Sequence, residues 1–593
     1  RFIDLTPELF HFKPRKDRAT KLLNFISEVI VNGNSEVKGR RLPIVSPLPK
    51  APKASPLEIP QGSRDIFKKL GPKGFADWML DQKRLLITDT TMRDAHQSLL
   101  ATRMRSYDMV KIAPTYAQNM SDLLSIECWG GATFDVALRF LKECPWQRIK
   151  NIRKAAPNIL TQMLLRSSNG VGYTNYADNV IEFFIKQSAE AGIDIFRVFD
   201  SLNWVENMRV AMDAVIESGK ICEGTVCYTG DIDDPDRAKY DLKYYVDMAK
   251  QLEKAGAHIL GLKDMAGLLK PAAATRLITA LKQEISIPIH FHTHDTSGIS
   301  AASVLAAAAA GVDAADAAMD SFSGLTSQPN LGSIVAALKA TDRNTGLDNA
   351  TIRQLSDYWE LVRRQYMAFE SDIRSGASEV YLHEMPGGQF TNLKEQARTM
   401  GLEERWHEVA MAYADVNRMF GDIVKVTPSS KVVGDMAIMM VSSNLTPEDV
   451  ENPNKDIAFP NSVVSLFKGE IGQTYQGFPK ALQKKILKGE KPLTERPGKY
   501  LEAVELEKQR SDAKDKTGEE VNDHDLASYL MYPKVYEDFA KTRGEFGPIS
   551  HLPTNVFFYG MVPFQEIMVD LEAGKTLVIR CQAISDIHED GTV

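Results

Sequence analysis

The chain has 593 residues, of which 44% are hydrophobic and 25% are charged, so its composition is that of a globular protein and its length predicts more than one domain. Its formal net charge of −7 comes without a long run of like charges, which argues against a nucleic acid or a membrane surface as partner. Five cysteines without a CxxC pair argue against a disulfide framework and favour a reducing compartment. No stretch approaches the roughly 18 apolar residues of a membrane span, so we expect a soluble protein.

Residues 1–62 predict an arm and a linker rather than a domain. Residues 18–33 predict a short helix that runs into a β-branched segment, and six prolines between Arg41 and Gly62 predict an extended tether. The chain starts at an arginine and ends on the polar residues 587–593, and we expect it to be a fragment of a longer protein.

From Leu85 onward, a short apolar run followed by a stretch of helical periodicity occurs eight times. Eight strand and helix units in succession predict a (β/α)8 barrel, also called a TIM barrel, over residues 63–345. The alternative is a doubly wound open sheet, which usually has a glycine-rich phosphate turn after its first strand. Here the first strand leads into TTMRDAHQS instead. The apolar runs begin at Leu85, Leu123, Ile159, Ile193, Gly224, Ala257, Pro288 and Val312.

The rest of the chain has two different patterns. Residues 346–545 are mainly helical in periodicity and predict a helical domain. Residues 546–593 contain two strand-like segments, 556–561 (VFFYGM) and 575–580 (KTLVIR). We expect these last residues to pack with the N-terminal arm as a small α+β unit made from both chain ends.

Polar residues follow several of the predicted strands at the end where barrel enzymes place their chemistry. His292 and His294 are two residues apart on the seventh strand, so both side chains leave the same face and can share one metal ion. Imidazole pairs suit zinc, manganese or related metals. Asp94, after the first strand, would add a third ligand and leave room for a fourth.

Lys263 ends the sixth strand, beside the two histidines. A protonated ammonium cannot coordinate a metal, so three interpretations stay open. The lysine can extend to solvent, it can form a Schiff base, or it can be carboxylated by CO2 so that its carbamate oxygens bind the metal. The neighbouring histidine pair favours the carbamate.

Arg166, after the third strand, and Gln97 offer what a small 2-oxo acid needs: a fork of donors for its carboxylate and a donor for its carbonyl oxygen. Either residue can instead serve the structure of the barrel rim. In the helical region, Thr427 precedes Pro428, which favours an extended backbone, and its hydroxyl can face the barrel mouth. A turn residue is the simpler interpretation of that threonine.

Motifs spread over essentially the whole chain resemble the carboxyltransferase domain of the pyruvate carboxylase family. Some of these motifs, such as DTTMRD and the HxH pair, are shared with a wider group of metal-dependent barrel lyases, whereas the lysine of KDMAG and the threonine of KVTPSSK are specific to carboxylases. The motifs include DTTMRDAHQSLLATR (89–103), ECWGGATFDVALRFL (127–141), QMLLRSSNGVGY (162–173), KDMAGLLKP (263–271), HTHDTSG (292–298), EMPGGQFTNL (384–393) and KVTPSSKVVGDMA (425–437).

The resemblance implies a role for each residue at a matching position. It implies that Thr427 is a proton shuttle and that Ser430 is a neighbour of biotin. The implied ligands of Zn2+ or Mn2+ are Asp94, carboxylated Lys263, His292 and His294. The implied pocket for pyruvate and biotin comprises Arg93, Gln97, Arg166 and Tyr173, with Asp135 close by.

The resemblance also implies an activity, the transfer of CO2 from carboxybiotin to pyruvate to give oxaloacetate, which serves anaplerosis and gluconeogenesis. It implies a homo-oligomer, a dimer or a tetramer, in a bacterial cytoplasm or, in a eukaryote, the mitochondrial matrix, of which we favour the cytoplasm. The sequence has no AMKM biotinylation motif and no glycine-rich ATP-binding loop, so we expect a biotin carboxyl carrier domain to act in trans.

Three kinds of alternative function stay open. The α subunit of oxaloacetate decarboxylase and a transcarboxylase subunit share the chemistry, but the N-terminal arm and the KTLVIR strand favour pyruvate carboxylase. A metal-dependent or Schiff-base aldolase or lyase shares the barrel, the histidine pair and the lysine. A scaffold protein would use the chain ends for assembly but would leave the polar residues at the barrel mouth unexplained.

Overall fold

The computed structural model describes residues 19–43, 47–53, 58–572 and 574–586. The predictions for the extreme chain ends and for parts of the proline-rich tether lie outside the described residues. Eight parallel strands close into a barrel in which each strand pairs with its neighbours in chain order and β8 pairs with β1, as predicted. The strands are β1 (Leu86–Asp89), β2 (Ser125–Trp129), β3 (Leu160–Leu165), β4 (Ile195–Phe199), β5 (Ile221–Cys227), β6 (Ile259–Asp264), β7 (Ile289–Thr293) and β8 (Ala314–Ala317).

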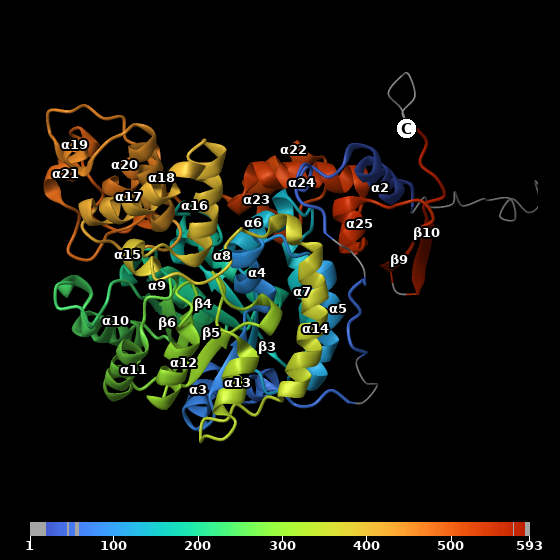
Figure 1. Ribbon diagram of the computed structural model, residues 1–593, viewed down its shortest axis with the longest axis horizontal. Coiled ribbons are helices and arrows are strands. Elements are labelled where there is room, and N and C mark those ends of the chain that lie inside the picture. Colours follow the sequence, from blue (N-terminus) through green and yellow to red (C-terminus); the bar gives the residue numbers. More distant parts are fainter. Residues whose placement is uncertain (1–18, 44–46, 54–57, 573, 587–593) are drawn as a thin grey trace, which may run out of the picture.

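Helices cover the outside of the barrel, and every residue of the eight strands is buried (Figure 1). Burial on both sides explains why the strands have contiguous apolar runs instead of alternation. The surrounding helices are α5 (Ser106–Asn119), α6 (Gly131–Arg139), α7 (Pro145–Ala155), α8 (Asp178–Ala191), α9 (Val205–Glu217), α10 (Leu242–Lys254), α11 (Pro271–Glu284), α12 (Ser300–Ala309), α13 (Leu331–Leu338) and α14 (Asn349–Gln365).

Helix α3 (Ser63–Leu80) closes the N-terminal end of the barrel. Phe67, Phe75 and Met79 of this helix form one apolar cluster with the residues that begin the strands, such as Leu86. Because this end is filled with side chains, the opposite end, where the strands finish, is the one available for a ligand.

A lobe of helices with its own apolar core lies over the C-terminal end of the barrel; we call it the helical lobe (Figure 1). Its core contains almost exclusively residues between Met385 and Leu487. The lobe comprises α15 (Val380–His383), α16 (Gly387–Thr399), α17 (Trp406–Met419), α18 (Ser429–Ser442), α19 (Pro447–Glu451), α20 (Asn461–Lys468) and α21 (Lys480–Leu487).

The last helices return to the barrel and meet the N-terminal arm. Helix α23 (Asp523–Met531) packs on α8, and α24 (Pro533–Phe546) packs on both α6 and the N-terminal helix α2 (Thr20–Asn32). Helix α22 (Leu506–Thr517) packs on α23 and α24. The arm and the end of the chain therefore lie side by side, as Figure 1 shows.

One local prediction near the chain ends is wrong. The segment VFFYGM is not a strand but mostly helix α25 (Thr554–Tyr559), which starts after Pro553 and ends before Gly560 at φ 71°. A short apolar run cannot be assigned by periodicity alone, and here one helical turn buries Phe557 against Phe25 of α2, with ring centroids 5.4 Å apart. The helix predicted within residues 18–33 is confirmed as α2, which continues through its β-branched segment to Asn32.

The strand predicted at KTLVIR is confirmed. It is β10 (Lys575–Arg580), which pairs antiparallel with β9 (Glu566–Glu572). Among the described residues, no helix is both long enough and apolar enough to cross a lipid bilayer.

Candidate active site

Three side chains that commonly bind metals converge at the C-terminal end of the barrel. Asp94 follows β1, and His292 and His294 come from β7 and the residue after it. Their ligand atoms lie within 4.8 Å of one another. Oδ2 of Asp94 is 3.2 Å from Nε2 of His292 and 3.5 Å from Nε2 of His294. All three side chains are buried.

Hydrogen bonds on the far side of each imidazole fix which nitrogen faces Asp94. Nδ1 of His294 lies 2.6 Å from the carbonyl oxygen of Thr326, which only accepts, so Nδ1 carries the hydrogen. Nδ1 of His292 lies 2.5 Å from Oδ2 of Asp316, which fixes the same tautomer. Both Nε2 atoms therefore present lone pairs, and that of His292 is buried without a hydrogen-bond partner among the described residues. Lone pairs that converge on a carboxylate repel one another unless a cation lies between them, so the donor set fits a metal ion.

Lys263 stands beside this cluster. It pairs in register with His292 across β6 and β7, it is 3% exposed, and its Nζ is 3.8 Å from Oδ2 of Asp94. Burial is the main cause that lowers the pKa of Lys263; Asp94 opposes the shift, and Arg93 and Arg197 reinforce it. A lowered pKa increases the fraction of neutral, nucleophilic amine, which both carbamate and Schiff-base formation require.

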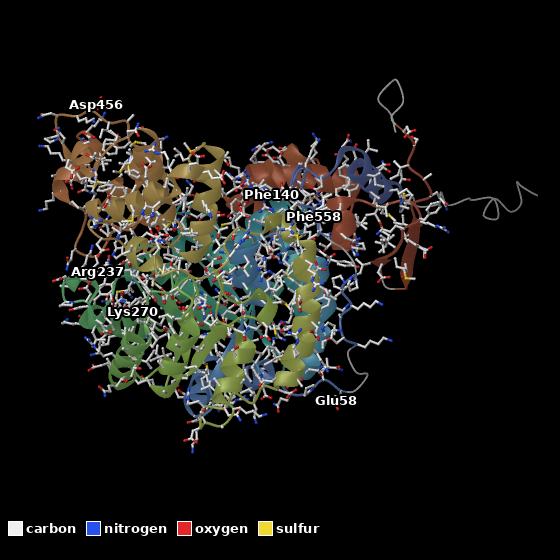
Figure 2. The ribbon with its side chains drawn as sticks, in the orientation of Figure 1. Glu58, Phe140, Arg237, Lys270, Asp456 and Phe558 are labelled. Atoms are coloured by element: carbon white, nitrogen blue, oxygen red, sulfur yellow. The ribbon has the colours of Figure 1, made fainter. Side chains whose placement is uncertain are left out.

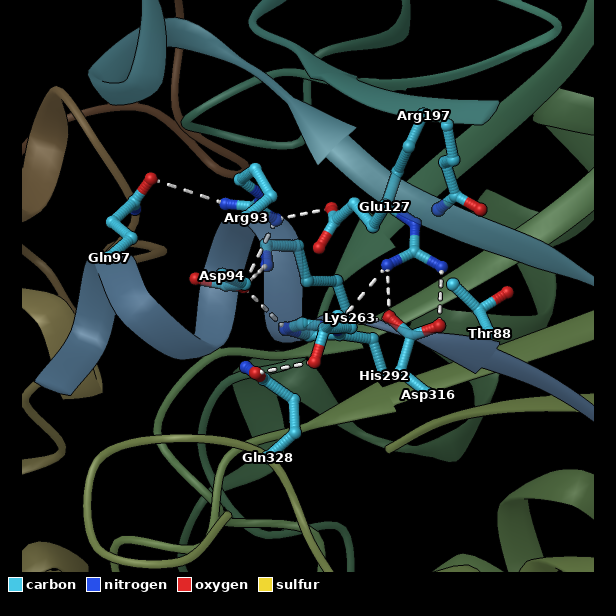
Figure 3. Close-up of polar contacts among 12 residues, drawn as sticks. Thr88, Arg93, Asp94, Gln97, Glu127, Arg197, Lys263, His292, Asp316 and Gln328 are labelled. Carbon is cyan, nitrogen blue, oxygen red and sulfur yellow. Dashed lines mark hydrogen bonds and ion pairs between the residues drawn. The ribbon is translucent and has the colours of Figure 1, made fainter. Parts of the chain in front are cut away.

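Arg93 holds the carboxylate of Asp94 in its ionised form. Its Nη2 is 3.1 Å from Oδ2 of Asp94 and also forms an ion pair with Glu127, while Oε1 of Gln97 lies 3.5 Å from Nη1 (Figure 3). Burial by itself would raise the pKa of Asp94, but the charge of Arg93 holds that pKa well below its ordinary value. The aspartate is therefore a permanent anion at the centre of the cluster.

The cluster opens into a cavity of about 1250 Å³ between the barrel mouth and the helical lobe. Such a volume is large enough for two small reactants at once. His292 lies beneath the cavity surface. The predicted site residues that line the cavity are Arg93, Asp94, Gln97, Asp135, Arg166, Tyr173, Lys263, His294 and Thr427.

Arg166 is already partly engaged in the protein itself. Its Nη1 donates to the carbonyl oxygens of Val171 and Gly172, at 3.1 and 2.9 Å. Its guanidinium also lies 4.9 Å from the ring centroid of Tyr173. A Cβ at Gly131 would meet this guanidinium at 2.6 Å, so glycine is needed there. The rim of the cavity is thus built around a fixed arginine.

Thr427 and Ser430, for both of which the family resemblance implies a role at the site, have different surroundings. Thr427 lines the cavity and is half-buried, whereas the other residues of 423–430 are buried. Ser430 is fully buried in α18, is not among the cavity-lining residues, and its hydroxyl has no hydrogen-bond partner among the described residues. The two side chains therefore do not face the same space.

Sequence reasoning missed a second cluster of charges, which fills the centre of the barrel beneath the metal ligands. Arg197 forms ion pairs with Glu223 and with Asp316, the second of which Figure 3 shows, and His290 bridges the two carboxylates at 2.9 and 2.6 Å. Although burial opposes the shift, Glu223 and Asp316 raise the pKa of His290 to about 9. The signal was present as single charged residues in the middle of apolar strands.

Two family comparisons match the two main parts of the molecule. Residues 184–358, the second half of the barrel and α14, match the HMGL-like family, and residues 380–580 match a family described as a conserved carboxylase domain. A barrel with a metal-ligand cluster at its mouth, joined to a carboxylase domain that covers the mouth, defines the carboxyltransferase class of barrel proteins.

Comparison with individual proteins narrows this class. The chain is 53% identical over 592 residues to pyruvate carboxylase of Bacillus subtilis and 47% identical over 596 residues to mitochondrial pyruvate carboxylase of Homo sapiens. It is 61% identical to the solved carboxyl transferase domain of Rhizobium etli pyruvate carboxylase, with a TM-score of 0.96, and covers 96% of that domain. The chain belongs to the pyruvate carboxylase family and corresponds to this domain. It spans about half the length of the curated relatives, 52% and 50% for these two.

Proposed function

We propose that this chain catalyses the transfer of CO2 from carboxybiotin to pyruvate, giving oxaloacetate. The observation that carries the proposal is the single cavity in which Asp94, Lys263 and His294 lie on the barrel side and Thr427 on the side of the helical lobe. A related solved structure is that of the Rhizobium etli domain with pyruvate and biocytin, which supports both reactants.

Pyruvate needs donors for its carboxylate and its carbonyl oxygen. Arg93 is fully buried and fixed by Glu127, so it offers its charge without the entropy cost of ordering a mobile side chain. Gln97 and Arg166 line the same cavity and supply neutral and charged donors. We propose that these three residues bind and orient the 2-oxo acid.

Asp94, His292 and His294 would hold Zn2+ or Mn2+, and Lys263, carboxylated on Nζ by CO2, would complete the ligand set. The lowered pKa of Lys263 supports this step, because only the neutral amine adds to CO2. Such a metal supplies Lewis-acid stabilisation of the charge that develops on the substrate oxygen. Arg93 adds a second positive charge next to that position.

The remaining step is a proton transfer, which we assign to Thr427. Loss of CO2 leaves a basic ureido group on biotin; the hydroxyl of Thr427 gives its proton to that group and takes one from the methyl carbon of pyruvate. The methylene carbon of the resulting enolate then forms the new bond to CO2. A hydroxyl is sufficient because it only relays a proton between two strong bases. Tyr173 and Asp135, at the rim, would complete the biotin pocket, whereas Ser430, which does not line the cavity, would not touch biotin.

We also propose how this chain is organised and where it works. Residues 63–345 form the carboxyltransferase barrel, and residues 346–545 complete its active site. Residues 1–62 and 546–593 contribute to a unit for tetramerisation or allosteric control of a homo-oligomer. The biotin arrives on a carrier domain. The relatives include bacterial and mitochondrial proteins, and we propose a bacterial cytoplasm as the location.

Biotin-dependent decarboxylation of oxaloacetate, the reverse half-reaction, tests the proposal with free biotin. The metal-loaded wild-type chain should be active, and Thr427→Ala should lose activity by about 10²- to 10⁴-fold with an unchanged thermal midpoint. Thr427→Ser, which keeps the hydroxyl, is the matched control and should retain most of it. An inactive wild type, or an active Thr427→Ala, would refute the assignment.

A buried lysine with a lowered pKa is also what a Schiff-base aldolase needs, so that function is the second candidate. Borohydride reduction in the presence of pyruvate separates the two. A covalent pyruvate adduct on Lys263 would favour the aldolase, whereas a CO2 adduct on the same nitrogen, seen by carbon-13 NMR after exposure to labelled bicarbonate, would exclude it.

A further inference from the structure

Away from the cavity, a third group of charges, two of them buried and two half-buried, joins the helical lobe to the barrel. Lys425 is 1% exposed, and its Nζ is 2.9 Å from Oε2 of Glu384 and 3.2 Å from Oγ1 of Thr229, which follows β5. Arg237, on the loop between β5 and α10, forms ion pairs with both Glu384 and Asp422. Figure 2 shows Arg237 at the junction of the lobe and the barrel. No part of the proposed chemistry uses these residues.

The pair Lys425 and Glu384 connects two segments that reach the active site. Lys425 lies two residues before Thr427, so the pair anchors the segment that carries the proposed proton shuttle. Glu384 begins the segment EMPGG, whose Gly387 packs on the metal site: a Cβ there would lie 3.0 Å from Nδ1 of His294. One ion pair thus ties the shuttle segment to the segment that backs a metal ligand.

The backbone at both carboxylates has a conformation that is costly for a residue other than glycine. Glu384 and Asp422 have φ of 56° and 53°, the left-handed region that glycine adopts at much lower cost. An ammonium as buried as that of Lys425 is also costly unless it is paired. Burial lowers the pKa of Lys425 to about 8, so the ammonium is still mostly protonated at pH 7 and the pair is intact.

The fold of the helical lobe does not depend on this network. The lobe has its own apolar core, which includes Val409, Tyr413 and Phe467, and the charges lie at its boundary with the barrel. What the network can determine is therefore the position of the lobe segments relative to the barrel mouth.

We propose that Lys425 and Glu384 are positioning residues that hold the hydroxyl of Thr427 in register with the metal ligands across the interface between lobe and barrel. This inference rests on the proposed function. Because proton transfer requires a separation set to within a fraction of an ångström, a small displacement of Thr427 slows the reaction without weakening substrate binding.

The test compares Lys425→Met, Glu384→Gln and the double variant with the wild type at pH 7. Two rates are measured: biotin-dependent oxaloacetate decarboxylation, and exchange of the pyruvate methyl protons with deuterium, followed by NMR in the presence of free biotin. In each variant, both kcat and the exchange rate should fall by about ten- to a hundredfold relative to the wild type. The KM for oxaloacetate should stay within about twofold, because the groups that bind the substrate are untouched.

The double variant removes both charges, so it avoids leaving one charge buried alone and should keep the wild-type thermal midpoint and metal content. Because the two residues act as one unit, the kcat of the double variant should equal that of each single variant. If the residues acted independently, the two fold-losses in kcat would multiply. The matched control is Lys239→Met: this lysine lies on the same loop as Arg237 and contacts the carbonyl of Gly421, and its loss should leave kcat unchanged.

Each outcome decides a different point. An inactive wild type overturns the proposed function and with it this inference. An active wild type together with wild-type kcat in the double variant overturns the positioning role alone. Failure of both the single and the double variants to fold, or a rise in KM that accounts for the whole loss, would show a structural or binding role instead.

Discussion

The barrel contains two buried polar clusters, one at its centre and one at its mouth, and they differ in whether their polar atoms have partners. At the centre, Arg197 and His290 lie between Glu223 and Asp316, and each cation reaches both anions. The hydrogen-bonding capacity of this central cluster is largely used within the protein.

At the mouth, the pattern is the opposite. The lone pairs on Nε2 of His292 and His294 point at the same carboxylate oxygen of Asp94, and the amine of Lys263 stands beside them. Buried polar groups in native proteins normally have partners, so Nε2 of His292, which has none among the described residues, indicates a place for a ligand. The difference teaches that burial and charge alone do not distinguish the mouth from the centre, whereas metal-binding atoms that converge beside a cavity do.

Removal of a ligand at the mouth should have the largest effect. His294→Asn deletes one Nε2 donor and should lower the metal content and reduce activity by at least about 10²-fold, because Lewis-acid stabilisation supplies several kcal/mol. Metal analysis and the decarboxylation assay measure both losses. The metal-free variant should unfold at or above the temperature of the metal-free wild type, since converging lone pairs are removed. His407→Asn, at an exposed position, is the control and should be neutral.

Breaking the central cluster should instead reduce stability. Arg197→Met leaves Glu223 and Asp316 buried without their main partner, which should cost about 3–5 kcal/mol in the free energy of unfolding. Denaturant unfolding measures this cost, and metal titration of the folded variant should show a much smaller change. If Arg197→Met lost metal but kept its stability, the central cluster would not differ from the cluster at the mouth in this respect.

Asp316 belongs to both clusters and so tests where one ends and the other begins. Asp316→Asn should weaken the orientation of His292 and lower metal affinity by about 10- to 100-fold. Glu223→Gln is the matched control, because Glu223 contacts Arg197 and His290 but not His292. Metal affinity that falls equally in both variants would mean that the clusters act as one.

The sequence predicted the mouth far better than the centre, and the reason is physical. The proposed metal ligands His292 and His294 are two residues apart at the end of β7, a spacing that places them on a common face, so their proximity follows from strand geometry. The partners of Arg197 come from other strands, and the sequence does not show which inward-facing residues meet across a barrel. The barrel itself was predictable because its strands are buried on both sides and give eight contiguous apolar runs.

Positions that depend on how the helical lobe packs were beyond sequence patterns. The placement of Thr427 at the cavity follows from the packing of the lobe on the barrel, whereas the sequence pattern alone favoured a simple turn residue and the family resemblance pointed to the site. For the same reason, sequence patterns did not show that Ser430, a few residues further along, is buried. The strand prediction for VFFYGM was wrong because a short, mostly apolar run fits a strand and a buried helical turn equally well.

A buried imidazole without a charge cluster gives the smallest effect and completes the comparison. Burial lowers the pKa of His383 to about 4, and its Nδ1 accepts a hydrogen bond from the backbone N–H of Met385 at 3.0 Å, so the ring is neutral in the folded chain. Because the folded pKa is below the unfolded value of about 6.5, the unfolded chain binds more protons between pH 6.5 and 4. The stabilisation is therefore complete above pH 6.5 and is lost as the pH falls toward 4.

At pH 5, this loss should amount to roughly 2 kcal/mol relative to pH 7.5, at about 1.4 kcal/mol for each pKa unit. His383→Gln keeps a hydrogen-bond acceptor but cannot titrate, so its thermal midpoint should fall less than that of the wild type between these two pH values. Equal pH dependence in both proteins would mean that the imidazole takes up its proton inside the fold, as His290 does between its two carboxylates. In that case, the difference in neighbouring charges would not explain a difference in protonation between His383 and His290.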